Sequence, residues 1–483
     1  MGRRFESVRF LLPAALLAFT VPVAPLFSHL PTGTRVAAGS TLIRQVPHLR
    51  QKPDFCGEAC AAMVLQSLGH RFDQDAVFDQ AGLDPLKGRG CTTPELKRAL
   101  DRIGFETGRV WSYVDPARAA GELERLWKEL YQDLVNQVPS IVCMRYDARP
   151  GANEHFRLML GYDAESDEVI YHEPAEREGG YRRMARATFL QLWPLHYRPD
   201  RWTVVRLRLQ AGSIVSPPLA RGPTDADYAQ HIRELRRRLP GNDFSYVIQR
   251  PFVVIGDESA ERVRRRARET IQWAVTRLKQ LYFTEDPDQI IDIWLFKNQA
   301  SYYRHAKALF GQKPSTPFGY YSPAQRALVM NISTGGGTLV HEMVHPFIAA
   351  NFPDCPAWFN EGLASLYEQC GEVDQAIYGY PNWRLPGLQQ AIRAGQLPSF
   401  RALCSSSTTE FYQDHRGTNY AQARYLCYYL QEQGKLRDFY HRFRRSAKRD
   451  PTGLATLRAV LDQPDLQAFQ KNWSRFVMNL KFD

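Results

Sequence analysis

Two histidines and a downstream glutamate form the most specific chemical pattern in the sequence. His341 and His345 belong to a His-Glu-Met-Val-His run, and Glu361 follows in Trp358-Phe-Asn-Glu-Gly362. On a helix, residues four apart share one face, so both imidazoles can reach one metal ion. Zinc in a catalytic site takes three protein ligands and keeps a fourth position for water. The sequence therefore predicts a zinc cofactor held by His341, His345 and Glu361.

Glu342 lies between the two histidines, on the adjacent side of the predicted helix. There its carboxylate can hold a water molecule and accept its proton, which is the chemistry of metal-assisted hydrolysis. An ordinary pair of surface or core histidines would leave the following Asn-Glu-Gly stretch and the apolar surroundings unexplained. Pro346 cannot donate a backbone hydrogen bond to the carbonyl of Glu342, so we expect a kink there.

These residues resemble the gluzincin metallopeptidases, which pair His-Glu-x-x-His with a glutamate on a following helix, often within Asn-Glu-Gly-x-Ala. This chain has Asn360-Glu-Gly-Leu-Ala364, and the likeness extends over about 252–443. The resemblance implies a thermolysin-like zinc peptidase fold that docks substrate backbone on the strand 327–332. It also implies that Tyr420 stabilises an oxyanion, as in zinc aminopeptidases; packing at a helix start explains this tyrosine equally well. The aminopeptidase Gly-x-Met-Glu-Asn clamp is missing, which favours an endopeptidase.

A second candidate site begins at Cys56, which directly precedes an expected helix over 58–68. A thiol at a helix N-terminus is close to the positive end of the helix dipole, so we expect its thiolate to be favoured. A nucleophilic cysteine also needs a base, and His155 opens the expected strand 155–162. A buried cysteine without catalytic function, in a module that binds peptide, is the alternative.

The orienting carboxylate for this base is predicted from the strand that follows. A polar turn at 164–167 leads back through a strand that ends at Glu173. If the hairpin is centred near Ala164, His155 and Glu173 lie opposite each other at its open end. Cys56, His155 and Glu173 then form a Cys-His-carboxylate set with the nucleophile first in the chain.

This stretch, over about 45–209, resembles the double-glycine leader (bacteriocin-processing) cysteine peptidases and their exported relatives. Their pattern is Gln, then Cys-Gly, later His-Phe, Gly-Tyr-Asp and Asp-Pro. The resemblance implies a papain-like fold and assigns Gln51 to the oxyanion hole. Glu173 stands where that family usually has aspartate, so the extra methylene is either absorbed by the backbone or weakens the triad. No transporter segments follow, so coupling to an ABC transporter is not implied.

The composition of the chain, and a linker-like stretch within it, indicate two domains. The 483 residues are 44% hydrophobic, which is ample for two packed cores. A Gly-, Pro- and Ser-rich stretch separates two periodic blocks. We expect an export segment over 1–38, a cysteine-peptidase-like domain over 39–210, a linker over 211–226 and a zinc peptidase domain over 227–483. Both domains are expected to belong to the α+β class.

The N-terminus predicts export. Three arginines precede an apolar stretch over 10–27, which is typical of an export signal. Prolines within the stretch argue against a membrane-spanning helix, and either a cleaved signal or an uncleaved anchor is compatible with it. We therefore expect a periplasmic, cell-envelope or extracellular protein that contacts a membrane only through this segment.

Eight cysteines in an exported chain make disulfides plausible, although the sequence does not give their pairing. One pair is excluded by geometry. Cys355 and Cys370 flank a single expected helix, which would hold them about 20 Å apart, whereas a disulfide needs Cα atoms within about 7 Å.

The net charge of +11 raises the question of nucleic-acid binding. The arginine runs at 236–238 and 262–266 lie among periodic apolar residues, which is typical of solvated helix faces, and no nucleic-acid-binding motif accompanies them. The predicted partner is therefore a peptide or protein substrate and not a nucleic acid.

The sequence predicts an exported two-domain peptidase but leaves three functions open. In the first, both domains are active. In the second, only the zinc domain is active and the other domain binds peptide. In the third, neither domain cuts peptides and the chain is a cell-envelope scaffold. The intact zinc ligand set argues against the scaffold. The glutamate at position 173 is the feature that favours the second function over the first.

Overall fold

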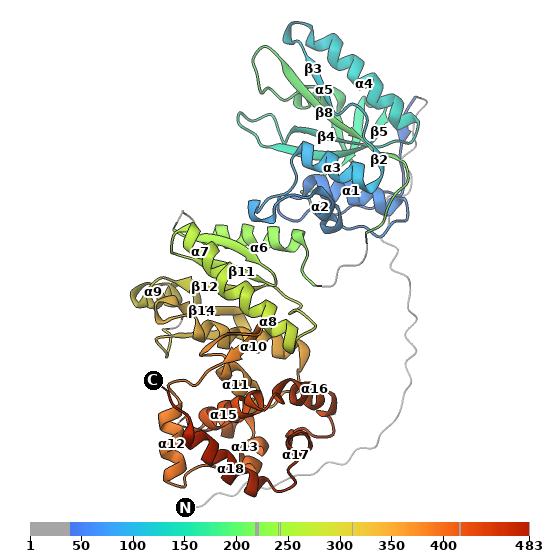
Figure 1. The fold of residues 1–483 in the computed structure, drawn as a ribbon. Coiled ribbons are helices and arrows are strands. Elements are labelled where there is room, and N and C mark those ends of the chain that lie inside the picture. Colours follow the sequence, from blue (N-terminus) through green and yellow to red (C-terminus); the bar gives the residue numbers. More distant parts are fainter. Residues whose placement is uncertain are drawn as a thin grey trace, which may run out of the picture.

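The computed structural model describes residues 39–217, 222–239, 241, 243–311, 313–414 and 417–482. The predicted export segment (1–38) and residues 218–221 of the predicted linker lie outside these ranges. Across the described ranges, no helix is both long enough and apolar enough to cross a membrane. The chain forms two mixed α/β units, one before and one after residues 218–221, and each has its own main sheet (Figure 1).

The N-terminal unit is a sheet covered by helices on both faces. The helices are α1 (Cys56–Ser67), α2 (Gln74–Ala81), α3 (Thr93–Ile103), α4 (Ala119–Val135) and α5 (Arg186–Leu192), with short 3-10 turns η1 (Pro85–Lys87) and η2 (Pro116–Arg118). The sheet strands are β1 (Thr41–Leu42), β3 (Trp111–Val114), β4 (Ser140–Arg145), β5 (Glu154–Asp163), β6 (Glu168–His172), β7 (Arg182–Ala185) and β8 (Trp202–Arg208), while β2 (Phe105–Glu106) pairs with β9 (Gln210–Ala211).

This sheet is antiparallel, in the order β3-β8-β4-β5-β6-β7, and β1 pairs with β5. Along β4, Ile141 and Cys143 pack in one core with α1 to α3, whereas Val142 and Met144 pack in another with α4 and α5. Successive side chains of a strand point to opposite faces, so a strand covered on both sides must be apolar throughout.

Helix α1 begins at Cys56, two residues before the predicted start. Residues 57–65 are all buried, because α1 packs against α2, α3 and the sheet. Gly69 follows the helix with a φ of +84°, a left-handed conformation that glycine adopts readily at a helix end. The thiol thus lies at the N-terminal end of a tightly packed helix.

The C-terminal unit has a mixed sheet in the order β10-β11-β12-β14-β13. Its strands are β10 (Ser245–Gln249), β11 (Phe252–Gly256), β12 (Ile291–Phe296), β13 (Gly319–Ser322) and β14 (Ala327–Asn331); β15 (Cys370–Val373) and β16 (Ala376–Gly379) form a separate hairpin. The three central strands are parallel, and the edge strands β10 and β13 run antiparallel to their neighbours. The expectation that strand 327–332 docks substrate backbone is wrong, because β12 and β13 already pair with both edges of β14. On this side of the sheet the free edge belongs to β13.

Helices make up most of the rest of this unit. They are α6 (Asp225–Arg238), α7 (Ala260–Arg266), α8 (Trp273–Leu281), α9 (Gln299–Phe310), α10 (Gly337–Asn351), α11 (Ala357–Leu366), α12 (Leu385–Arg393), α13 (Phe400–Ser405), α14 (Thr408–Tyr412), α15 (Thr418–Glu432), α16 (Leu436–Ser446), α17 (Leu454–Leu461) and α18 (Leu466–Asn479). A π-helical segment (Ala267–Gln272) joins α7 to α8, and short 3-10 turns follow β13 and β14. Helix α10 carries both predicted histidine ligands and continues through Pro346.

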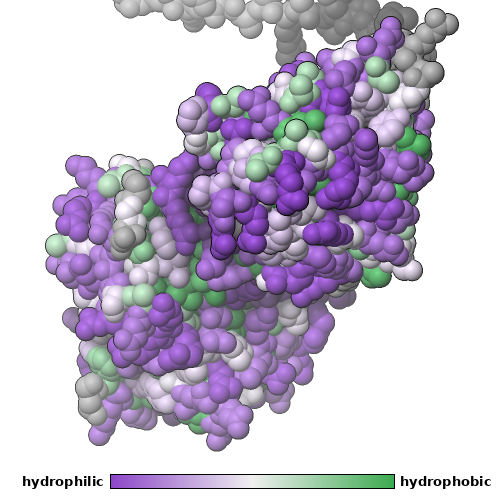
Figure 2. Space-filling view, turned by 90° about the horizontal axis from the view of Figure 1, so that it is seen from above, coloured by the Kyte–Doolittle hydropathy of each residue, from purple (hydrophilic) through white to green (hydrophobic). Residues whose placement is uncertain are grey.

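Both arginine runs lie on exposed helix faces, as predicted. Arg236 to Arg238 end α6, and four arginines of α7 surround the buried Val263. The face of the molecule that Figure 2 shows is mostly hydrophilic.

Helix α6 belongs to the cores of both units. Ala226 and Ala229 pack with the core of the N-terminal unit, whereas Tyr228, Ile232 and Leu235 pack with one face of the C-terminal sheet. A helix that is apolar on two faces must be covered on both of them. The two units therefore share a helix and are not joined by a linker alone.

We expect Ile232→Ala to lower the free energy of unfolding by about 2–5 kcal/mol, because it leaves a cavity at a fully buried position. Since α6 is shared, calorimetry should show both units losing stability together in this variant. Arg237→Ala, on the exposed face of the same helix, is the control and should change nothing. Two independent transitions, only one of them shifted by Ile232→Ala, would contradict the shared core.

Candidate active sites

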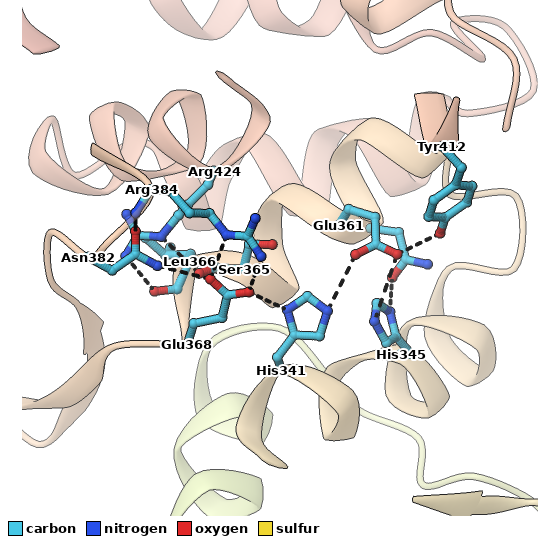
Figure 3. Close-up of polar contacts among 11 residues, drawn as sticks. His341, His345, Glu361, Ser365, Leu366, Glu368, Asn382, Arg384, Tyr412 and Arg424 are labelled. Carbon is cyan, nitrogen blue, oxygen red and sulfur yellow. Dashed lines mark hydrogen bonds and ion pairs between the residues drawn. The ribbon is translucent and has the colours of Figure 1, made fainter. Parts of the chain in front are cut away.

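The three predicted metal ligands converge between α10 and α11. One ligand atom from each of His341, His345 and Glu361 lies within 4.8 Å of the others. His341 Nε2 is 3.4 Å from Glu361 Oε2, and His345 Nε2 is 3.9 Å from Glu361 Oε1. Figure 3 shows both imidazole rings turned toward the Glu361 carboxylate. One cation could be bound by all three side chains.

A side-chain oxygen lies beside the outward-facing ring nitrogen of each histidine, within hydrogen-bond geometry only for His345. His341 Nδ1 lies 3.5 Å from Glu368 Oε1, and His345 Nδ1 lies 3.0 Å from Asn360 Oδ1. An oxygen beside Nδ1 favours the tautomer that carries its proton there, which leaves Nε2 free to bind a metal. Sequence reasoning assigned no role to Asn360, although it belongs to the Asn-Glu-Gly stretch, and it missed Glu368.

Glu368 is itself held firmly. Its carboxylate accepts hydrogen bonds from Asn382 Nδ2 at 2.9 Å and from Arg384 Nε and a terminal nitrogen at 2.8 and 2.7 Å (Figure 3). The Arg384 contact is a two-point ion pair, the geometry that fixes a carboxylate best. Glu368 can therefore orient His341 without moving itself.

A buried arginine fastens the end of the helix that carries Glu361. Arg424 is fully buried on α15, and its guanidinium donates to the backbone carbonyls of Ser365 and Leu366 at the C-terminal end of α11, and to that of Tyr380. The last carbonyls of a helix lack partners within the helix, and a cation there also complements the helix dipole. Arg424 thus stabilises α11 in place beside α10.

The donor set fits zinc. Glu361 is 5% exposed, and its Oε2 makes no hydrogen bond to any described residue. Burial raises the pKa of Glu361, but His341, His345 and Tyr412 outweigh it and bring the pKa to about 2. For His341, burial lowers the pKa, yet the nearby carboxylates raise it to about 9 when no cation is bound, so a metal would displace a proton from Nε2 on binding. A buried carboxylate oxygen without a hydrogen bond, beside two imidazole nitrogens, matches the ligands of catalytic zinc.

Glu342, the predicted proton acceptor, follows His341 on α10 and is half-buried. It makes no hydrogen bond or ion pair with any other described residue, so its carboxylate is uncommitted. Its negative charge is close enough to raise the pKa of His341.

Two tyrosines lie beside the same cluster. Tyr412, at the end of α14, donates its hydroxyl to Glu361 Oε1 at 2.5 Å. Tyr420, which sequence reasoning selected, has its ring 6.1 Å from that of Tyr412 and lies under the Arg384 guanidinium. Burial and the charge of Glu361 raise the pKa of both hydroxyls, so both retain their protons. The sequence analysis did not select Tyr412, because no motif in the short segment around it indicates a role at the metal site.

The predicted thiol-site residues meet at one cavity in the N-terminal unit. Gln51, Cys56 and His155 line a cavity of about 1290 Å³. Cys56 comes from the first turn of α1 and His155 from the start of β5. Among the described residues the Gln51 side chain makes no hydrogen bond, so its amide is available to a ligand.

Glu173 holds His155, although the hairpin register differs from the prediction. Leu158 pairs with His172, and a bulge lies between Met159 and Gly161. Continued by one residue, this register places Glu173 opposite Arg157 and not opposite His155. The predicted pairing is therefore wrong. Its carboxylate nevertheless meets His155 Nε2 at 2.5 Å, because diagonal neighbours are within reach of a long side chain. The additional methylene group of glutamate lengthens the side chain, which helps its carboxylate to reach His155 across this diagonal.

Arg157 is a site residue that sequence reasoning missed. It is buried, and its Nε donates to Glu173 Oε2 at 2.7 Å while a terminal nitrogen donates to the Tyr146 carbonyl at 2.9 Å. Its role could have been predicted, because it is a charged residue two positions after His155 in an otherwise apolar strand. Burial raises the pKa of Glu173, but His155 and Arg157 outweigh it, so the pKa lies below its usual value.

The expected stabilisation of the Cys56 thiolate is wrong. Burial raises the pKa of Cys56 to about 12, although the backbone N–H of Phe156 faces the sulfur and lowers it. The charge of Glu58, two residues along α1, raises it further. Desolvation of a thiolate thus outweighs the helix dipole here. The thiol is protonated at neutral pH and would need a base to act as a nucleophile.

All eight cysteines, each within the described ranges, carry free thiols. The plausible disulfides are therefore not formed in this structure. Cys355 precedes α11 and Cys370 lies in β15 beyond it, and these two do not bond each other.

Residues 43–198 match the model of a family described as Peptidase_C39 like family. The N-terminal unit is similar to C39-like peptidases. This match supports the predicted likeness to a peptidase family for residues 43–198 only. No curated protein matches the chain.

Two solved structures are similar to part of the chain. The peptidase domain of Streptococcus ComA, a bi-functional ABC transporter involved in quorum sensing, has 14% identity and a TM-score of 0.23, covering 34% of this chain and 99% of that one. A double glycine motif protease from an AMS/PCAT transporter, in complex with the leader peptide, has 18% identity and a TM-score of 0.23, covering 35% of this chain and 98% of that one.

We expect Glu173→Gln to lower the free energy of unfolding by about 3–5 kcal/mol at pH 7, because Arg157 then keeps a buried charge without its partner. The folded pKa of Glu173 lies below the unfolded value of about 4.3, so its stabilisation is present above that pH and lost as the pH falls. Urea unfolding at pH 7 and pH 3 should therefore show a smaller difference at the lower pH.

The exposed Glu165→Gln serves as the control and should be neutral at both pH values. A difference for Glu173→Gln that is equal at pH 7 and pH 3 would contradict the assigned ion pair.

Proposed function

We propose that this chain is a peptidase with two catalytic centres, a zinc centre in the C-terminal unit and a thiol centre in the C39-like unit. The observation that carries the zinc centre is the convergence of His341, His345 and Glu361 within 4.8 Å around a carboxylate oxygen that has no hydrogen bond. The family match over residues 43–198 supports a peptidase or peptide-binding function for the first unit.

The metal would be held by His341 Nε2, His345 Nε2 and the Glu361 carboxylate. When bound there, zinc supplies Lewis-acid chemistry, which polarises a carbonyl group and makes water more acidic. Asn360 and Glu368 keep the two imidazoles turned inward, so little reorganisation is needed on binding. Tyr412 holds one oxygen of Glu361 and leaves the other free.

Glu342 would be the general base and acid. Its uncommitted carboxylate accepts a proton from the attacking water, and then gives that proton to the nitrogen of the leaving amine. The Tyr420 hydroxyl keeps its proton and makes no hydrogen bond to a described residue, so it can donate to the oxyanion that forms as the carbonyl is attacked. Burial of the surrounding groups strengthens each of these interactions.

In the thiol centre, His155 would act as the base. Its Nδ1 takes the proton of Cys56, while Glu173 holds Nε2 and stabilises the imidazolium that results. The sulfur bonds to the carbonyl carbon, the amine leaves with the proton from His155, and water then hydrolyses the thioester. The Gln51 amide and the backbone N–H of Cys56 are the donors for the oxyanion. Proton transfer during attack is required because the resting thiol is protonated.

A second candidate is that the C39-like unit only binds peptide. The raised pKa of Cys56 favours it, since a nucleophile with a buried, protonated thiol reacts slowly without efficient proton transfer. The chain would then be a zinc peptidase with an attached peptide-binding module. In either case we infer that the protein acts outside the cytoplasm, on the basis of its N-terminal sequence.

We expect digestion of an unbiased peptide library, analysed by mass spectrometry, to give two sets of cuts. Glu342→Gln should abolish one set while retaining one equivalent of zinc, because Glu342 transfers a proton but does not bind the metal. Cys56→Ala should abolish the other set. Cuts that all survive Glu342→Gln would contradict the zinc centre, and cuts that all survive Cys56→Ala would make the C39-like unit a binding module.

We expect Glu368→Gln to raise the dissociation constant for zinc by about 10–100-fold, because it removes the carboxylate that orients His341. Competition with a chelator of known affinity measures this without reference to catalysis. Glu269→Gln, on the exposed surface of the C-terminal unit, should leave the constant unchanged. Equal zinc affinity in the wild type and Glu368→Gln would show that Glu368 does not orient the ligand.

A further inference from the structure

We propose that helix α6 of the C-terminal unit positions the wall of the thiol cavity, with Gln230 and Arg233 as positioning residues. The functional part of this inference rests on the proposed thiol centre. The short segment from Gln51 to Cys56 carries the proposed oxyanion donor and the nucleophile.

Helix α6 binds this segment directly. Gln230 Nε2 donates to the carbonyl of Pro53 at 2.9 Å. Arg233 forms a two-point ion pair with Asp54, with distances of 2.9 and 3.3 Å to its two oxygens. Asp54 lines the cavity and lies two residues before Cys56. Three hydrogen bonds from one helix thus reach the residues that lead into α1.

The conformation of Asp54 explains why the segment needs this support. Asp54 has a φ of +64°, the left-handed region that a non-glycine residue rarely adopts. Such a conformation persists only where the surroundings hold it. The guanidinium of Arg233 fixes the Asp54 side chain, and Phe55 N–H bonds back to the carbonyl of Lys52.

The same helix holds a second loop of the cavity wall. Arg236 donates to the carbonyls of Leu86 and Lys87 at 2.7 and 2.8 Å. Gly88 follows so closely that a Cβ there would lie 3.2 Å from the backbone nitrogen of Arg233. This loop continues into Arg89 to Thr92, which line the cavity.

The two loops support each other and reach back to α1. A Cβ on Gly90 would lie 1.9 Å from the carbonyl oxygen of Asp54, so only glycine allows this approach. The next residue, Cys91, donates its backbone N–H to the buried Glu58 at 2.6 Å. The wall is therefore a stack in which α6 lies on one side and α1 on the other.

Helix α6 can serve as a fixed support because its other face is buried in the C-terminal unit. Tyr228, Ile232 and Leu235 pack there, and His231 Nε2 lies 2.6 Å from Asp292 at the start of β12. An isolated surface ion pair such as Arg233–Asp54 contributes little by itself. Donors on one rigid helix have lost most of their freedom already, so together they hold both loops. The thiol site of the C39-like unit is thus completed by the second unit.

Hydrogen exchange of the full-length protein, read by mass spectrometry over residues 51–58 and 86–92, tests the inference. Arg233→Ala should raise exchange over 51–58 by about tenfold, and Arg236→Ala should do so over 86–92, because each loses hydrogen bonds that hold its loop. Arg233→Lys, which keeps the charge, should restore part of the protection. Arg237→Ala is the control, since among the described residues that arginine pairs only with Glu234 on its own helix. Unchanged exchange in both Arg233→Ala and Arg236→Ala would overturn the inference.

Kinetics separate positioning from general stability. Arg233→Ala should lower kcat for the Cys56-dependent cuts with KM unchanged, because the loop carries groups that act in the transition state. Its zinc content and Glu342-dependent cuts should equal those of the wild type. Equal loss of both sets of cuts would point to unfolding and overturn the positioning role. If the wild type makes no Cys56-dependent cuts, the thiol centre fails as a function, while the exchange measurement still decides whether α6 holds the wall.

Discussion

Glu361 carries a negative charge that is almost completely removed from water, and much of the C-terminal unit serves to keep that charge between two imidazoles. A buried carboxylate is costly unless charges or hydrogen bonds compensate it. One oxygen has the Tyr412 hydroxyl, and the other faces His341 Nε2 without a hydrogen bond. A divalent cation at this point would satisfy the carboxylate and both Nε2 atoms together. The arrangement of α10 and α11, and the buried Arg424 that fastens the end of α11, follow from this requirement.

At the thiol cavity a buried carboxylate is also compensated, but by different groups. Glu173 is buried between a base and a fixed cation, so Arg157 supplies permanently the positive charge that a metal would supply in the other unit. His155 is then oriented without being the sole partner of the carboxylate. What this site lacks is a stabilised thiolate, because the N-terminus of α1 is too closely packed. Its chemistry depends on geometry, and that geometry depends on loops held partly by the second unit.

The sequence predicted those parts of both sites that local spacing determines. His341 and His345 are one helical turn apart, and the expected strands 155–162 and 327–332 are found as β5 and β14 at nearly the expected bounds. It failed where the chain turns or where distant segments meet. Glu368 lies past the end of α11, so helical periodicity could not place it beside His341.

The remaining failures have the same physical origin. The turn lies between Asp163 and Glu168, later in the chain than symmetry about Ala164 had predicted, and this shifts the hairpin register although the bulge in β5 reduces the shift by one residue. The sequence did not show that α6 packs against both units. Small alanines on one face and larger apolar residues on another give the pattern of a single amphipathic helix.

Anomalous diffraction at the zinc absorption edge, from crystals of protein purified without added metal, is the most direct test of this account. We expect one peak per chain, about 2.0–2.1 Å from Nε2 of both His341 and His345 and in contact with the Glu361 carboxylate. The peak should be missing from crystals of His345→Ala. A wild-type crystal with no peak at this position, after incubation with zinc, would contradict it.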